Sequence, residues 1–207
     1  MRAATEAGVR HVIYTSMVNL PAISSVRLLD DYRKTEEMLK ASGLTYTILR
    51  NGYYFDMLSM FIGDAPKSGR IRYPAGDGRA SWAARTDLAE AAANILLSDG
   101  HEGRVYELNT NTSYSFHDVA AVLSEVLGQA IEYVAIPLEV MRQELQDQQM
   151  SPAEIELMVG LAASIRHSEA DHPSPELERF LGRPPTDLRQ FLGQTYSSPD
   201  RATGRAD

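Results

Sequence analysis

Apolar residues in the first fifty positions follow two different spacings, which predict two kinds of element. Residues 12–14 form a short run of strand-forming residues that is apolar on both faces, and residues 45–49 predict a second buried strand. Between them, residues 28–39 repeat apolar side chains at helical intervals, and Gly43 follows where a helix would end. Strand, helix and strand in this order are typical of a parallel sheet with helices on its faces, so we predict an α/β fold.

Later segments predict further elements around a stretch that is rich in glycine and proline. Within this stretch, Gly76-Asp77-Gly78 is interpreted as a turn. The predicted strands are residues 70–73, 104–108 and 131–135, and residues 19–25 are a predicted loop. Three helices are predicted before the last third of the chain: residues 2–7, residues 86–97 with Thr86 as the cap, and residues 115–127 with a capping-box pair at Ser115 and Asp118. Four more helices are predicted to begin near Leu138, Ser151, Ser174 and Thr186. The last third of the chain is therefore predicted to be helical.

Composition and charge narrow the class of protein. The 207-residue chain has an ordinary apolar fraction of 43% and a net charge of -8, which disfavours a nucleic-acid or anionic-membrane surface. It has no cysteine, so disulfides, thiolate metal sites and cysteine nucleophiles are excluded. No apolar run approaches the roughly 20 residues that cross a bilayer, and residues 1–6 lack the apolar stretch of a secretory signal. We therefore expect a cytoplasmic protein without a membrane or nucleic-acid partner.

Several catalytic patterns do not occur in the sequence. No Gly-x-Gly-x-x-Gly is present, so no segment has the turn that brings a backbone close to a dinucleotide pyrophosphate. No tyrosine has a lysine four residues later, and Tyr32 has Glu36 at that position. There is no Gly-x-Ser-x-Gly elbow, and the scattered histidines give no metal site. The acidic pairs Asp30-Asp31 and Glu36-Glu37 are interpreted as solvated helix faces.

Three segments are similar to one known family. They are residues 7–16 (AGVRHVIYTS), residues 30–36 (DDYRKTE) and residues 46–55 (YTILRNGYYF). These segments resemble the second half of the nucleotide-binding domain of NmrA-like atypical short-chain reductases, in the branch of NAD(P)H-dependent quinone oxidoreductases and triphenylmethane reductases. The similarity extends to residues 179–186. Because such reductases open with a strand, a glycine-rich turn and a helix, we expect this chain to lack that N-terminal half.

The resemblance implies NADP or NAD as the cofactor and assigns residues to it. Thr15 and Ser16 would lie beside the nicotinamide or the substrate, since ligands bind at the carboxyl ends of parallel strands. The alternative is that their hydroxyls satisfy backbone groups there. Residues 51–56 would line the nicotinamide half of the cofactor, or else form a glycine turn with aromatic packing. These six residues are Asn51, Gly52, Tyr53, Tyr54, Phe55 and Asp56.

The resemblance also implies a reaction. Tyr32 is the candidate catalytic residue, as a proton or hydrogen-bond donor to a carbonyl, and the alternative is that its ring packs beside Leu28 and Leu39. The implied activity is hydride transfer from NAD(P)H to a quinone or a similar electron-poor aromatic, a small-molecule acceptor. Two alternatives stay open, which are a non-catalytic NAD(P)-sensing regulator and an inactive fragment. We expect the chain alone to be inactive.

The expected organisation follows from the fold and the resemblance. Residues 1–110 would be the second half of a Rossmann-like NAD(P)-binding domain, with residues 56–80 contributing to a substrate lobe. Residues 111–196 would complete that small, mainly helical lobe, and residues 197–207 would be a disordered tail. A strand that has lost a neighbour leaves an open sheet edge, so a homodimer is an expected arrangement.

Overall fold

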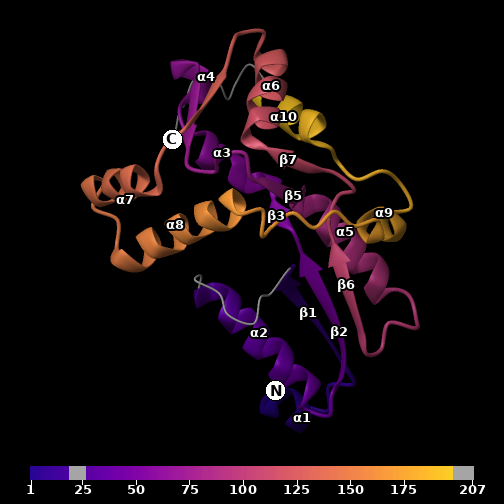
Figure 1. The fold of residues 1–207 in the computed structure, drawn as a ribbon. Coiled ribbons are helices and arrows are strands. Elements are labelled where there is room, and N and C mark those ends of the chain that lie inside the picture. The colour runs from indigo at the N-terminus through magenta and orange to yellow at the C-terminus, as the bar shows by residue number, and fades with distance from the viewer. Residues whose placement is uncertain (19–26, 198–207) are drawn as a thin grey trace, which may run out of the picture.

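The computed structural model describes residues 1–18 and 27–197, and a three-stranded parallel sheet forms one part of it (Figure 1). The strands lie in the order β1-β2-β6, where β1 is His11–Met17, β2 is Thr45–Asn51 and β6 is Arg104–Leu108. Ser16 is the register partner of Arg50, and Asn51 is the partner of Leu108. The carboxyl ends of the three strands therefore meet at one edge of the sheet.

Helices cover both faces of this sheet. On one face lies α2 (Arg27–Lys40), and on the other lies α5 (Arg85–Leu96) with α9 (Glu176–Leu181) against it. Consecutive residues of a strand point to opposite faces. Accordingly, Arg50 bonds Glu36 of α2, whereas Leu49 packs in one core cluster with α5 and α9. The predicted α/β fold with a Rossmann-like parallel sheet is confirmed, and a short α1 (Arg2–Glu6) precedes β1.

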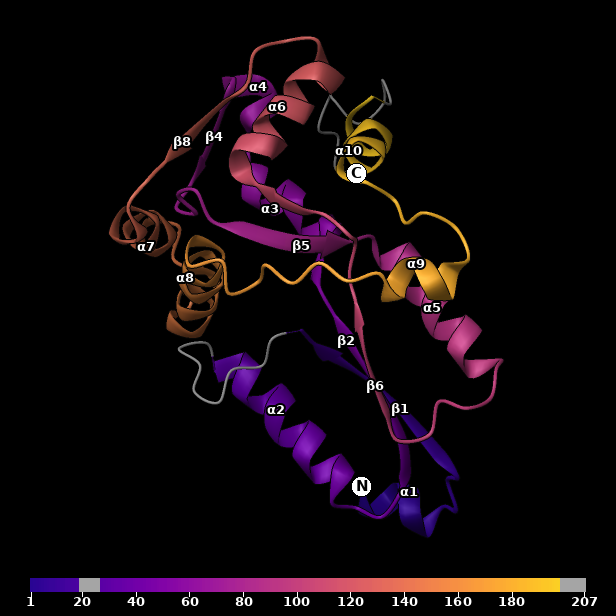
Figure 2. The same cartoon turned by 45° about the vertical axis from the view of Figure 1, so that its right-hand side comes forward.

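The second part is a mixed lobe above the sheet, which Figure 2 shows from the side. Its sheets have the orders β3-β5-β7 and β4-β8. Its elements are β3 (Tyr53–Tyr54), η1 (Phe55–Met57), α3 (Leu58–Ile62), α4 (Ala65–Ser68), β4 (Arg70–Tyr73), β5 (Arg79–Ala83), β7 (Ser113–Ser115), α6 (Phe116–Leu127), β8 (Glu132–Ala135), α7 (Leu138–Asp147), α8 (Pro152–Arg166) and α10 (Leu188–Tyr196). Aromatic rings fill its core, where Phe55 stacks on Trp82 and Tyr73 stacks on Phe116.

Local signals placed most helix starts correctly. Ser115 with Asp118 and Ser151 with Glu154 form the reciprocal hydrogen bonds of capping boxes, so both predicted starts are confirmed. The predicted cap at Thr86 is wrong. The residue at the cap position of α5 is Ala84, which has no capping side chain, and the Asp56 carboxylate accepts from the Arg85 backbone N–H at 3.2 Å. A carboxylate from a distant segment therefore serves this helix N-terminus.

Other differences arise where pairing depends on distant partners. The pattern did not predict β3, β5 or β7, in which β5 pairs with β3 and with β7, each about thirty residues away in the sequence. The helix α9 packs on α5 and β6, beside the main sheet, although its position in the sequence lies between lobe helices. Residues 19–25 and 198–207, where a loop and a tail were predicted, lie outside the described residues. In the described ranges, no helix is long and apolar enough to cross a membrane.

Candidate functional site

The carboxyl ends of β1 and β2 bring the predicted site residues to one edge of the sheet. Thr15 and Ser16 end β1, and Asn51 ends β2 directly beside Met17. Thr15 is exposed on the α5 side, whereas Ser16 is buried on the α2 side. The parallel register therefore places the two predicted segments, 15–16 and 51–56, next to each other.

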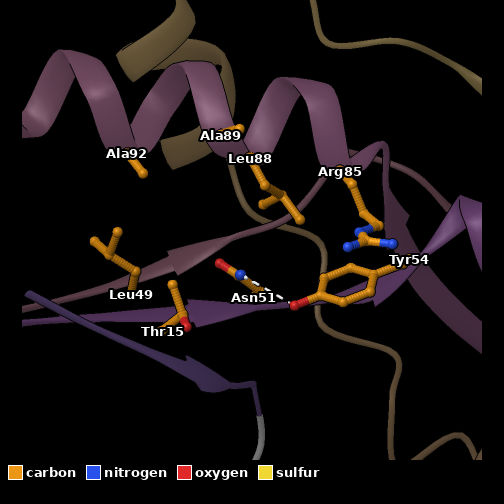
Figure 3. Close-up of a pocket in the computed structure, with 8 residues that line it drawn as sticks. All are labelled: Thr15, Leu49, Asn51, Tyr54, Arg85, Leu88, Ala89 and Ala92. Atoms are coloured by element: carbon orange, nitrogen blue, oxygen red, sulfur yellow. Dashed lines mark hydrogen bonds between the residues drawn. The ribbon is translucent and has the colours of Figure 1, made fainter.

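A cavity of about 230 Å³ opens between this edge and α5 (Figure 3). Its floor comes from the two strands and its roof from one face of the helix. The lining residues are Thr15, Leu49, Asn51, Tyr54, Arg85, Leu88, Ala89 and Ala92. The helix residues lie at positions 85, 88, 89 and 92, a spacing that puts them on one face. The result is an apolar slot with polar groups at the end where Tyr54 and Arg85 lie.

Asn51 is the main polar group inside this cavity. Its side chain is only 6% exposed, and its Nδ2 donates to the Tyr54 hydroxyl at 3.4 Å. Its Oδ1 is buried and has no hydrogen-bond partner within the described part of the chain. In Figure 3 this oxygen points away from Tyr54, into the space between the strands and α5. A buried amide oxygen without a partner is costly, so the site has an acceptor available for a ligand N–H or O–H.

Tyr54 and Arg85 form the polar end of the cavity. The Arg85 guanidinium carbon lies 5.8 Å from the centroid of the Tyr54 ring, within the range of a cation–π contact. The Arg85 side chain is exposed, and its backbone N–H is held by Asp56. Asp56 therefore serves the N-terminus of α5 and places Arg85 above Tyr54.

Ser16 has a different role from the one its position suggests. Its hydroxyl donates to Glu36 Oε1 at 2.7 Å, so the proton of Ser16 is already used. Glu36 also accepts two hydrogen bonds from Arg50, at 2.9 and 2.7 Å, and one from Lys40 at 3.2 Å. Glu36 is only 2% exposed, which corrects its interpretation as part of a solvated helix face. Ser16 can therefore accept a hydrogen bond from a ligand, but it has no free proton to donate to one.

The ionisation of Glu36 follows from these contacts. Burial alone would raise the pKa of Glu36, because a charged carboxylate is poorly stabilised away from water. The hydrogen bonds from Arg50, Ser16 and Lys40 outweigh that effect, and the pKa of Glu36 lies below its ordinary value. Glu36 is therefore ionised at neutral pH and joins β1, β2 and α2 through one buried charge.

Three members of the segment 51–56 turn away from the cavity. Tyr53 is 3% exposed, and its hydroxyl shares a hydrogen bond of 3.0 Å with Ser164 of α8. Burial raises the pKa of Tyr53 to about 12. Phe55 is fully buried among the aromatic rings of the lobe. At Gly52, an added Cβ would lie 1.5 Å from Asn109 Oδ1, so the missing side chain makes room for Asn109.

Tyr32 lies on α2, half-buried, with its ring centroid 6.5 Å from that of Tyr14. Burial raises the pKa of Tyr32, and the neighbouring phenols of Tyr54 and Tyr14 raise it further. The phenol is therefore protonated at neutral pH. The structure brings Tyr32 near the same sheet edge as Tyr54, which keeps its predicted role as a donor open to test.

Sequence reasoning missed the α5 wall and Glu36. The spacing of Arg85, Leu88, Ala89 and Ala92 was the available signal for the wall, because it describes one helix face. For Glu36, the signal was its position one turn after Tyr32 and three residues before the buried Leu39. Among the described residues, no group of three histidine, aspartate or glutamate side chains is arranged to hold a metal ion.

The fold and this edge define a class of protein. A parallel sheet with helices on both faces, and a cavity at the carboxyl ends of its strands, is the arrangement of Rossmann-like ligand-binding proteins. Residues 1–192 match the NmrA-like family, and the chain belongs to that family.

Known proteins place the chain within one branch of the family. Quinone oxidoreductase 2 of Escherichia coli (strain K12) is 31% identical over 206 residues, which cover 95% of this chain and 68% of that protein. The Escherichia coli NADPH-dependent quinone oxidoreductase complexed with NADPH is 30% identical with a TM-score of 0.86, over 93% of this chain and 68% of that chain. The Citrobacter sp. triphenylmethane reductase complexed with NADP(H) is 29% identical with a TM-score of 0.84, over 93% of this chain and 68% of that chain. The branch is confirmed, and the chain spans about two thirds of the length of these relatives.

Proposed function

We propose that this chain forms the nicotinamide side of an NAD(P)H-dependent reductase whose substrates are quinones or similar electron-poor aromatics. The observation that carries the proposal is the buried carboxamide of Asn51 at the carboxyl end of β2. Its Oδ1 has no partner in the described residues and points into an apolar cavity. A nicotinamide has a flat apolar ring and a carboxamide with N–H donors, so its chemistry matches this cavity.

Different residues of the cavity would contact different parts of the cofactor. Asn51 Oδ1 would accept from the carboxamide N–H, and Leu88 and Ala92 would contact the ring. Arg85 has an exposed guanidinium at the cavity mouth, where it would attract the negative charge of a dinucleotide phosphate. A bound NAD(P)H supplies the hydride, while the protein supplies orientation and an apolar surrounding.

The relatives support this assignment through what they bind. One relative is a quinone oxidoreductase solved with NADPH, and another is a triphenylmethane reductase solved with NADP(H). Both are similar over 93% of this chain. The match to the family covers residues 1–192, which include both strands of the site. The acceptor class and the choice between NADPH and NADH remain part of the proposal.

The proton of the reaction has a separate source in this proposal. A quinone that has received a hydride becomes an anion, and water or a phenol can protonate it. Tyr32 is protonated at neutral pH because burial raises its pKa. Ser16 cannot serve as the donor while its proton is held by Glu36.

Binding of reduced nicotinamide mononucleotide tests the proposal, because that molecule has the nicotinamide half without the adenylate. The readout is the methyl NMR signal of ¹³C-labelled Met17, which lies beside Asn51, and of Met57, which follows β3. We expect saturable shifts with a dissociation constant near 1 mM, or about -4 kcal/mol. Asn51→Leu should weaken binding about tenfold, the effect of one lost buried hydrogen bond. Asn111→Leu, at an exposed position, is the matched control.

Turnover separates the reductase from the regulator. At saturating reduced mononucleotide and with 1,4-benzoquinone present, the wild-type chain should accelerate loss of the reduced-nicotinamide absorbance relative to the same mixture without protein, contrary to the sequence-based expectation of an inactive chain. Binding of the reduced mononucleotide without any acceleration of its oxidation would favour a non-catalytic NAD(P)-sensing protein over a reductase. Absence of shifts at both Met17 and Met57 would overturn the nicotinamide assignment itself.

A further inference from the structure

A second and larger cavity lies in the lobe, away from the strand ends. It has a volume of about 410 Å³ and lies between α3, β4, α7 and α8. The two cavities share no lining residue, because the cavity at the strand ends is lined by β1, β2, β3 and α5. In Figures 1 and 2, α8 lies between α7 and the end of β2. Its volume is within the range of small-molecule sites.

Four methionines contribute to the wall of this lobe cavity. Met60, Met141, Met150 and Met158 line it together with Phe61 and Tyr73. These four are half of the eight methionines in the chain. Methionine side chains are flexible and polarisable, and they make favourable contacts with aromatic rings. A wall of this kind suits a flat, apolar, aromatic molecule.

The charged groups at the cavity leave no cation free for an anionic ligand. Arg72 pairs with Glu144 at 2.9 Å, and Arg70 pairs with Glu132 at 3.4 Å. Both arginines line the cavity, and both have carboxylate partners. A negatively charged ligand would have to compete with these pairs and would also meet the Asp64 carboxylate, which lines the cavity, so a neutral ligand fits better than an anion.

Tyr73 lines the cavity and has a buried hydroxyl group. The residue is 3% exposed, and its hydroxyl has no hydrogen-bond partner among the residues that the structure describes. Its ring is held between Phe61, at a centroid distance of 4.9 Å, and Phe116, at 4.6 Å. Buried hydroxyls in proteins are nearly always paired, so this donor calls for an acceptor that the described chain does not provide.

We propose that the lobe cavity is a binding site for a neutral, flat aromatic molecule with a carbonyl oxygen. The methionines and Phe61 would contact the ring, and the Tyr73 hydroxyl would donate to the carbonyl. This site is independent of the nicotinamide-side edge and needs no bound dinucleotide. Its ligand would be held there without reacting.

Methionine methyl NMR tests the site directly, because the eight signals report on different places. The ¹³C-methyl-labelled chain is titrated with 1,4-naphthoquinone in the absence of any dinucleotide. Saturable shifts are expected for Met60, Met141, Met150 and Met158, while the exposed Met38 stays unchanged. Shifts confined to Met17 and Met57 would overturn this proposal while leaving the proposed reductase intact. No saturable shift at any of the four lining methionines would also overturn it.

Filling the cavity gives a second, independent test. Met141→Phe combined with Met158→Phe should raise the dissociation constant of naphthoquinone at least about tenfold, because larger rings occupy the space of the ligand. Met38→Phe is the matched control, since Met38 is 62% exposed on α2 and outside the cavity. Thermal melting confirms that each variant is folded. Unchanged affinity in the folded double variant would overturn the proposal.

The role of the Tyr73 hydroxyl is tested with two probes, naphthoquinone and naphthalene, which have the same two fused rings. Tyr73→Phe should weaken naphthoquinone about tenfold, the effect of one lost hydrogen bond. The same variant should leave naphthalene binding unchanged, because naphthalene has no carbonyl. Equal effects on both probes, or no effect on either, would overturn the role of Tyr73 as the carbonyl donor.

Discussion

Replacing Glu36 by glutamine should destabilise the chain far more than the same change at Glu37, its neighbour on α2. Glu36 is 2% exposed and accepts hydrogen bonds from Arg50, Ser16 and Lys40. Glu37 pairs with Arg33 at 2.8 Å, but its side chain is 60% exposed. The two variants make the same chemical change in two different surroundings.

The magnitude follows from what each variant leaves behind. Glu36→Gln removes the charge that Arg50 pairs with, and breaking a buried ion pair costs about 3–5 kcal/mol. Arg50 is 26% exposed and also lies 3.7 Å from Glu107, so water and a second carboxylate offset part of this loss. We therefore expect a loss of about 3 kcal/mol. At Glu37 the expected loss is below about 1 kcal/mol, as for exposed pairs.

The difference between the wild type and Glu36→Gln should depend on pH. The pKa of Glu36 is lowered from its ordinary value of 4.5 in the folded chain. A lowered folded pKa contributes stability that is complete above the unfolded pKa and is lost as pH falls through the folded pKa. The destabilisation should therefore be full at pH 7 and should shrink as pH falls below about 4.5.

Urea denaturation followed by circular dichroism measures these free energies of unfolding. The wild type, Glu36→Gln and Glu37→Gln are compared at neutral pH and again below about pH 4.5, where the pKa of Glu36 predicts the change. A loss below about 1 kcal/mol for Glu36→Gln, or equal losses for the two variants, would refute the buried-charge argument. A difference that grows as pH falls would refute the assigned sign of the pKa change.

Three further predictions concern glycine positions and the candidate donor. Gly52→Ala should destabilise the chain by about 2 kcal/mol in urea denaturation, because its Cβ would lie 1.5 Å from Asn109 Oδ1. Gly193→Ala should stabilise it by about 0.5–1 kcal/mol in the same assay, since this α10 position has nothing within 4 Å of an added Cβ. If the chain reduces quinones as proposed, Tyr32→Phe should lower kcat/KM less than about tenfold, because water can protonate the product; a far larger loss would identify Tyr32 as the proton donor.

The elements that could be predicted from sequence are those whose signals are local. The capping boxes at Ser115 and Ser151 lie within four residues of the atoms that they bond, so the sequence contains the whole interaction. The cap of α5 could not be found in this way. Its carboxylate belongs to Asp56, twenty-nine residues before Arg85, and only the folded chain brings the two together.

The site was predictable in position but only partly in orientation. Because parallel strands end at the same edge of a sheet, the pattern placed Thr15, Ser16 and Asn51 together. It did not reveal that Tyr53 would turn into the lobe, because that depends on pairing with Trp82 of β5, which the pattern did not predict as a strand. The burial of Glu36 was missed for a similar reason, since its partner Arg50 lies on another element.

At Gly52, the absence of a side chain serves packing within the protein and not the predicted contact with a cofactor. The resemblance implied that Gly52 lines the nicotinamide half of the cofactor, but the space beside it is occupied by Asn109. The Nδ2 of Asn109 donates to the His172 carbonyl at 2.8 Å, while the Gly52 N–H donates to Leu108. Gly52 thus lets the segment around His172 lock onto the end of β2, directly beside Asn51. Its influence on a bound ligand would act through the position of Asn51, so stability and binding should change together when Gly52 is replaced.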